Sequence, residues 1–218
     1  MTYAQVTALQ YGLIGFLAIW GIVLVPQIVV HLHRYAMVLP KRLLTSGVVT
    51  MYFTFTLALV MLPLPGPNTP RLSQTVQLQP FQWVADIGSE LHKHGLSDAQ
   101  WFTTQTFSQL AMNVLLFVPL GFFARTLWRR GIVGGAALGF GFSLLIEITQ
   151  ATANFGTAPF VYRVFDVDDL MANTAGALLG WIAAALFLAL RKARATSTRT
   201  TVRLPIPDRK GIHLTQAR

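Results

Sequence analysis

Five apolar stretches, each about 20 residues long, constrain the fold of this chain more than any other feature. They run from about residue 11 to 30, 43 to 62, 106 to 127, 132 to 151 and 170 to 190. An α-helix needs about 20 mostly apolar residues to cross the hydrocarbon core of a bilayer. The stretches therefore predict an all-α, polytopic membrane helix bundle with about five transmembrane helices.

The composition agrees with a membrane protein and narrows the kinds of functional site. Of the 218 residues, 53% are hydrophobic and 11% are charged, whereas soluble domains carry about 25% charged residues. The sequence has no cysteine, so disulfides, thiolate metal sites and cysteine nucleophiles are excluded. The first stretch is too long for a cleaved signal peptide, and no Lys or Arg precedes it.

The basic residues gather in alternate connections between the apolar stretches. Three lie between the first and second stretches, three at the junction of the third and fourth, and eight after the fifth. Only Arg71, Lys93 and Arg163 belong to the other connections. Because Lys and Arg mark the cytoplasmic side, we expect the N-terminus outside and the C-terminus in the cytoplasm. The basic residues then encode membrane topology, so lipids rather than nucleic acid are the expected partners.

The composition also divides the chain into three parts. Residues 1–42 hold an additional first helix and a cytoplasmic loop, and residues 43–190 hold a four-helix membrane domain with an outer loop over residues 65–105. Residues 191–218 are rich in Thr, Ser and Arg and lack apolar periodicity, which predicts a disordered tail. This tail serves either as an orientation signal or as an attachment to anionic lipid head groups.

Polar side chains within the last three stretches are predicted to face the bundle interior, because exposing them to lipid is costly. Those within about 10 Å of the outer surface are Asn113, Glu147, Gln150, Asp169 and Asn173. The connection before the last stretch adds Arg163 and Asp166. Glu147 and Asp169 are the candidate catalytic groups, and the candidate ligand-binding residues are Asn113, Gln150, Arg163, Asp166 and Asn173.

Small residues accompany these polar groups at helical spacing. Gly135 and Gly139 lie on the helix face of Glu147, and Gly176 and Gly180 lie on the face of Asn173. Small residues allow helix backbones to approach closely, so both faces are predicted to pack against neighbouring helices. Pro119 lacks an N–H and is predicted to bend the third transmembrane helix.

The order and spacing of these residues resemble those of the VanZ-like family of bacterial integral membrane proteins. The motifs that carry the resemblance are Asn113-x5-Pro119-Leu120-Gly121, Glu147-x2-Gln150, Arg163-x2-Asp166-x2-Asp169-x3-Asn173-Thr174-x-Gly176, and the outer-loop run Gln77-Leu78-Gln79-Pro80-Phe81. The resemblance covers about Leu43 to Leu190, and Gln77 stands where the family usually has Asn. It implies a multi-pass protein of the bacterial cell membrane with a link to the cell envelope. The family's namesake is associated with low-level resistance to teicoplanin, a glycopeptide antibiotic.

Three functions remain open, and the sequence does not decide whether the chain is an enzyme. In the first, the outer polar cluster binds or modifies a lipid-linked or cell-wall component, with Glu147 or Asp169 as acid/base and Arg163 positioning an anionic group. In the second, the cluster only holds helices together in a noncatalytic membrane accessory or scaffold. A transporter is disfavoured, because the inner halves of the stretches lack a polar stripe and no internal repeat is visible. No metal or cofactor is expected, and the oligomeric state is not predicted.

Overall fold

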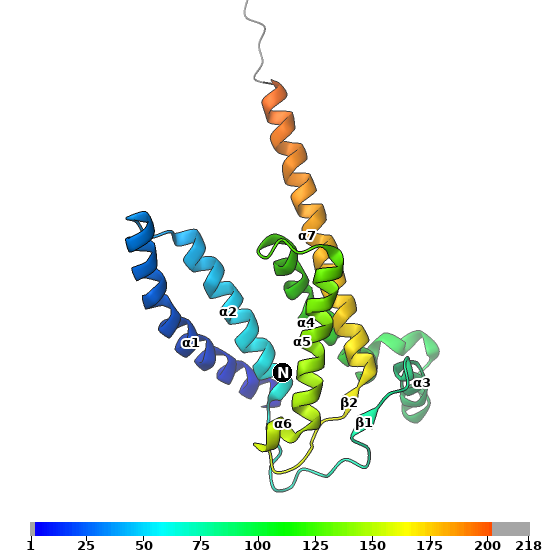
Figure 1. The fold of residues 1–218 in the computed structure, drawn as a ribbon. Coiled ribbons are helices and arrows are strands. Elements are labelled where there is room, and N and C mark those ends of the chain that lie inside the picture. Colours follow the sequence, from blue (N-terminus) through cyan, green and yellow to red (C-terminus); the bar gives the residue numbers. More distant parts are fainter. Residues whose placement is uncertain (1–2, 202–218) are drawn as a thin grey trace, which may run out of the picture.

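The computed structural model describes residues 3–201, which are mostly helical (Figure 1). Five helices of this described part are long and apolar enough to cross a membrane. They are α1 (Tyr3–Tyr35), α2 (Pro40–Met61), α4 (Gln105–Thr126), α5 (Ile132–Ala151) and α7 (Val167–Thr201). The all-α membrane bundle and its five predicted spans are therefore confirmed.

The short elements lie in the two long connections. The first connection contains β1 (Val76–Gln77), α3 (Gln82–His94) and the 3-10 helix η1 (Asp98–Thr103). The second contains α6 (Ala153–Gly156) and β2 (Phe165–Asp166). β1 and β2 pair in parallel, with Val76 opposite Phe165 and Gln77 opposite Asp166, and so join two connections far apart in sequence.

The first and last helices are longer than the apolar stretches that predicted them. α7 continues as a helix through Thr201, so it enters the segment from residue 191 that was predicted to be disordered. Residues 202–218 of that predicted tail lie outside the described residues. Pro26 and Pro119 are both accommodated within helices, in α1 and α4 respectively.

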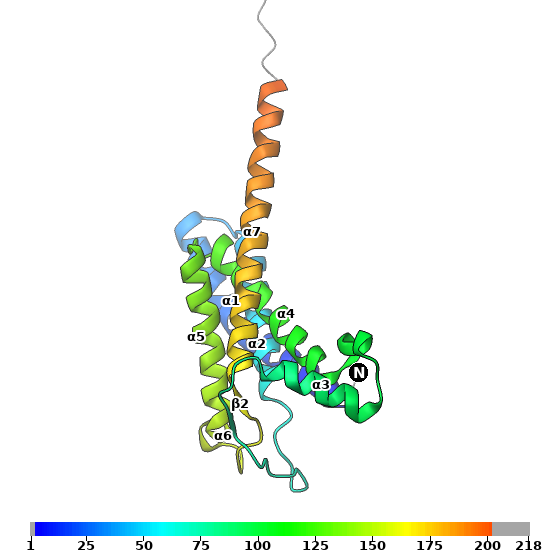
Figure 2. The same cartoon turned by 90° about the vertical axis from the view of Figure 1, so that its right-hand side faces the viewer.

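α7 packs against α4 and α5, and the three helices form the body of the bundle (Figure 2). Their contact depends on glycine, because a Cβ at Gly176 would overlap the Val114 carbonyl and a Cβ at Gly180 would overlap the Val118 carbonyl. The small-residue face predicted for the last span is thus confirmed as the seam between α4 and α7. On α5, Gly139 packs against the Ala177 side chain.

The α1–α2 hairpin stands beside this three-helix body. In Figure 1 the C-terminal end of α2 lies close to the body, and the helix diverges from the body toward its N-terminal end. Near the centre, the Tyr52 hydroxyl of α2 donates a hydrogen bond of 3.0 Å to the Leu116 carbonyl of α4. The Tyr52 ring also meets Phe123 edge to face, with ring centroids 5.5 Å apart.

The two ends of the bundle differ in charge and in structure. The α1–α2 turn, the α4–α5 turn and the C-terminal end of α7 all lie at one end, and these segments carry most of the basic residues (Figure 1). The opposite end carries β1 and β2 and is called the strand end. The grouping of basic residues at one end agrees with the predicted topology, and the placement of the strand end outside the cell stays a prediction.

α3 is an amphipathic helix held at the side of the strand end (Figure 2). Its Ile87 and Leu91 side chains are buried. The Glu90 carboxylate accepts hydrogen bonds from the backbone N–H groups of Gln105 and Thr106, which begin α4. These two bonds lower the pKa of Glu90 from its ordinary value, since they stabilise the ionised form. The part of the first connection from Gln82 to His94 is therefore a helix held at the start of α4 rather than an open loop.

Candidate functional site

The seven predicted site residues all lie at the strand end, and they come from three helices and one connection. α4 supplies Asn113, and α5 supplies Glu147 and Gln150. α7 supplies Asp169 and Asn173, which lie one turn apart on the same face. Arg163 and Asp166 precede α7. We call these seven residues, together with Asp168, the polar cluster.

A series of carboxylates in the cluster holds backbone N–H groups. Glu147, which is only 1% exposed, accepts a hydrogen bond of 3.0 Å from the Asp166 N–H. Asp166 in turn accepts one of 2.8 Å from the Asp168 N–H at the start of α7. Asp168 then accepts bonds of 2.6 and 3.1 Å from the N–H groups of Phe81 and Trp83. These contacts link α5, β2, α7 and the first turn of α3.

Asp166 is the acid of this series that lies between the membrane-spanning helices, and burial shifts its pKa. Desolvation raises the pKa of Asp166 above its ordinary value, and the negative charges of Asp168 and Asp86 act in the same direction. The hydrogen bond from the Asp168 N–H opposes the shift, because it stabilises the carboxylate. The surroundings of Asp166 therefore disfavour the ionised form of its carboxyl group.

Two amides connect the helices of the cluster directly. The Asn113 side chain donates a short hydrogen bond to the Asp169 carboxylate, which joins α4 to α7. Asn173 is 4% exposed and donates a bond of 2.8 Å to the Ser143 hydroxyl of α5. The Asn173 side-chain oxygen is buried and has no hydrogen-bond partner. The cluster therefore contains one unsatisfied acceptor, on Asn173.

Gln150 and Arg163 have a different role from the other five predicted residues, because both bind the carbonyl end of α2. Gln150 donates to the Val60 carbonyl at 2.8 Å, and Arg163 donates to the Leu62 carbonyl at 3.3 Å. Between them, the Tyr162 hydroxyl donates to the Met61 carbonyl at 2.7 Å. Three consecutive carbonyls that lack partners within the helix are thereby satisfied.

Arg163 also contributes charge to the cluster. Its guanidinium interacts favourably with the carboxylates of Glu147 and Asp169, in addition to lying at the negative end of the α2 dipole. The Arg163 Nε is buried and has no hydrogen-bond partner. The cluster therefore retains one unsatisfied donor, on Arg163, and one unsatisfied acceptor, on Asn173.

Sequence reasoning missed Asp168 and Tyr162 as residues that shape the site. Asp168 lies in the first turn of α7, and an acid at that position usually stabilises the N-terminus of its own helix. Here the Asp168 carboxylate accepts hydrogen bonds from the N-terminus of α3 instead, and only the tertiary fold brings these groups together. Tyr162 carries no recognisable signal, because a tyrosine in a connection has no preferred partner.

The outer-loop motif, Gln77 to Phe81, takes part in the same hydrogen bonds. The Gln77 amide closes a local turn, accepting from the Gln79 N–H at 2.7 Å and donating to the Gln79 carbonyl at 2.8 Å. The turn brings Phe81 to the Asp168 carboxylate. The outer-loop motif and the motif that begins α7 are therefore one structural unit.

Chemically, the cluster offers four carboxyl groups, one guanidinium and three amides, and the carboxyl groups mostly face protein N–H groups. Among the described residues, no group of three or more His, Asp or Glu side chains is arranged to hold a metal ion. Two cavities are lined by other residues than the cluster, one of about 430 Å³ between α2 and α4 and one of about 330 Å³ beside Ile146 and Asn154.

Comparisons with known proteins give one match. The sequence pattern of the VanZ/LLP1 family matches residues 49–188, which is more than half of the chain. Searches of curated proteins and of solved structures found no match. The matched range includes α4, α5, both strands and every residue of the polar cluster.

Proposed function

Because the chain belongs to the VanZ/LLP1 family, we propose that it is a multi-pass protein of the bacterial cell membrane that binds a lipid-linked cell-envelope component at its polar cluster. The basic residues at the opposite end would place the cluster at the outer leaflet. The observation that carries the proposal is the pair of buried, unpartnered atoms, Arg163 Nε and Asn173 Oδ1. Buried polar atoms are normally hydrogen bonded, so each of these two atoms favours a polar partner that the chain itself does not supply.

The charges of the cluster favour a head group rich in hydroxyls over an anionic one. The cluster contains one guanidinium and the four carboxyl groups of Glu147, Asp166, Asp168 and Asp169. A phosphate would meet four acidic groups with only one cation to offset its charge. A sugar hydroxyl donates to a carboxylate or to the Asn173 oxygen, and it also accepts from Arg163. A lipid that carries a glycan is therefore the proposed class of ligand.

Binding is favoured over a chemical reaction. A general acid or base must reach the proton that it transfers. Glu147 already accepts from the Asp166 N–H, and Asp169 already accepts from the Asn113 amide. These contacts orient both carboxyl groups toward the protein rather than toward a reactant.

A noncatalytic scaffold is the second candidate. It is favoured by the same hydrogen bonds, since Asn113, Glu147, Gln150 and Asp168 each join two segments of the chain. In a scaffold these residues would support folding alone. The two candidate functions differ in whether Arg163 Nε and Asn173 Oδ1 form hydrogen bonds with a membrane lipid.

Lipid binding by the purified full chain in nanodiscs distinguishes them. The probe is a diglycosyl diacylglycerol, compared with phosphatidylglycerol by native mass spectrometry. Arg163→Lys keeps the positive charge but removes Nε, so glycolipid binding should fall about tenfold or more. Arg71→Lys is the matched control, because Arg71 is an exposed arginine of the other outer connection. Equal binding of both lipids, or equal glycolipid binding by Arg163→Lys and the parent chain, would refute the proposal.

A cellular experiment addresses the link to glycopeptides that the family resemblance suggests. Expression of the chain in a sensitive Gram-positive host should reduce susceptibility to teicoplanin, and Arg163→Lys should remove most of the effect. Membrane levels of both proteins are compared by immunoblot. Unchanged susceptibility with correctly inserted protein would separate lipid binding from any role in resistance.

A further inference from the structure

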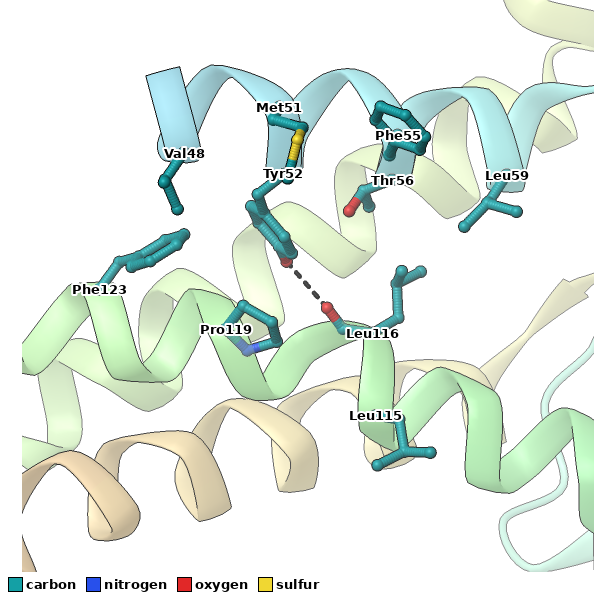
Figure 3. A pocket seen from close by; sticks show the side chains of 10 residues that line it. All are labelled: Val48, Met51, Tyr52, Phe55, Thr56, Leu59, Leu115, Leu116, Pro119 and Phe123. Atoms are coloured by element: carbon teal, nitrogen blue, oxygen red, sulfur yellow. Dashed lines mark hydrogen bonds between the residues drawn. The ribbon is translucent and has the colours of Figure 1, made fainter. Parts of the chain in front are cut away.

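A groove within the membrane-spanning region runs between α2 and α4, away from the polar cluster (Figure 3). It has a volume of about 430 Å³. Its walls are formed mainly by apolar side chains, among them Val48, Phe55, Leu59, Leu115 and Phe123. Since both helices are predicted to lie in a bilayer, the medium that fills this groove is lipid.

α2 is hydrogen bonded to the rest of the bundle by three side chains at its strand end and by one further side chain near its middle, and the groove lies along the part of α2 between and around these contacts. At the strand end, Gln150, Tyr162 and Arg163 hold the last carbonyls of α2. Further along, Tyr52 spans the gap to the Leu116 carbonyl (Figure 3). From Val48 to Leu59 the groove extends over about 16 Å of α2 at 1.5 Å per residue. This length suits one extended hydrocarbon chain.

One polar group lines the groove without a partner. Thr56 is 1% exposed, and its hydroxyl oxygen is buried and forms no hydrogen bond. Figure 3 shows this hydroxyl directed from α2 toward α4. Tyr52 is a polar neighbour of Thr56. Its hydroxyl donates to the Leu116 carbonyl, and the Tyr52 and Thr56 hydroxyls do not meet in hydrogen-bonding geometry. The Thr56 hydroxyl is therefore a donor available to an occupant of the groove.

We propose that this groove binds one acyl chain of an ester-linked glycerolipid, whose ester carbonyl accepts a hydrogen bond from the Thr56 hydroxyl. Thr56 precedes Met61, the end of α2, by five residues, or about 7 Å. That depth is near the boundary between hydrocarbon and head groups, where glycerolipid esters lie. An isoprenoid chain would fill the same apolar space but offers no acceptor to Thr56. The site is separate from the polar cluster and does not depend on glycan binding there.

Photocrosslinking of the full chain in nanodiscs tests the site. The probe is phosphatidylethanolamine with a diazirine on one acyl chain, and adducts are located by peptide mass spectrometry. Adducts should concentrate on residues 48–59 and 115–123. Leu115→Phe fills the groove from a position that is already 63% exposed, so the adducts there should fall at least fivefold. Val133→Phe, at a 79% exposed position of α5, is the control and should leave them unchanged.

A second comparison tests the hydrogen bond itself. Thr56→Val keeps the side-chain shape and should reduce crosslinking by the ester-linked probe about three- to tenfold. The same substitution should not affect an ether-linked probe, which lacks the carbonyl. Adducts spread over all lipid-facing surfaces would overturn the proposal, and so would equal sensitivity of both probes to Thr56→Val. Displacement of the adducts by excess polyprenyl phosphate, but not by diacyl lipid, would identify an isoprenoid occupant and likewise overturn it.

Discussion

The Glu147 carboxylate of α5 accepts a hydrogen bond of 3.0 Å from the backbone N–H of Asp166, 19 residues further along the chain. The bond fixes β2 against α5 just before α7 begins. An acid within a membrane span is costly, and here it is almost completely buried against the chain itself. The contact makes Glu147 a determinant of the fold at the strand end.

Glu147→Gln and Glu147→Ala are expected to differ in stability. Glutamine retains a side-chain oxygen that accepts from the Asp166 N–H, whereas alanine leaves that N–H buried and unpaired. The alanine variant should lose about 1–3 kcal/mol of folding free energy, and the glutamine variant clearly less. Thermal unfolding of the full chain in nanodiscs measures the difference. Equal stability of the two variants would show that the Asp166 bond contributes nothing.

Asp168→Ala is expected to release α3 from the bundle. The substitution removes the acceptor for the N–H groups of Phe81 and Trp83, which begin that helix. Hydrogen–deuterium exchange should increase across Gln82–His94 and stay unchanged in the centres of α4 and α7. Asp86→Ala is the control, because Asp86 is an exposed acid of α3 whose side chain accepts from Gln82 within the same helix. Similar exchange in both variants would contradict the anchoring role of Asp168.

Glu90 should make stability depend on pH in the acidic range. In the unfolded chain its carboxyl titrates near the ordinary value of 4.5, and in the folded protein its pKa is lower because of the Gln105 and Thr106 N–H groups. Ionised Glu90 therefore stabilises the fold above that value, and the contribution is lost as pH falls through the folded pKa. Between pH 7 and 3, the gap in unfolding temperature between the parent chain and Glu90→Gln should narrow at the acidic end. Asp98→Asn, at an exposed position of η1, is the comparison, and a gap that is independent of pH would contradict the prediction.

Gly180→Ala should disrupt the seam between α4 and α7. An added Cβ overlaps the Val118 carbonyl, which is backbone and cannot rotate away. Overpacking of this kind costs about 1–3 kcal/mol. Gly141→Ala is the matched control, since nothing lies within 4 Å of a Cβ added there. Equal unfolding temperatures of the two variants in nanodiscs would argue against close packing at Gly180.

Much of the fold follows from sequence because membrane helices are specified locally. A run of about 20 apolar residues must satisfy its own backbone hydrogen bonds, so length and hydropathy identify each span. The spacing of Gly176 and Gly180 likewise predicts a close helix contact without identifying α4 as the partner. The helical extension of α7 past residue 191 was not predicted, because helicity there has no apolar period to mark it.

The sequence by itself determined five spans, the grouping of basic residues at one end, and the collection of Asn113, Glu147 and Asp169 at the other. Only the tertiary structure decided what these side chains contact, because a carboxylate accepts from any nearby N–H and its sequence position does not name the donor. In the folded chain Asp168 accepts from the start of α3, and Gln150 and Arg163 donate to the last carbonyls of α2. The tertiary structure also created the groove at Thr56, which depends on the separation of two helices that are far apart in sequence.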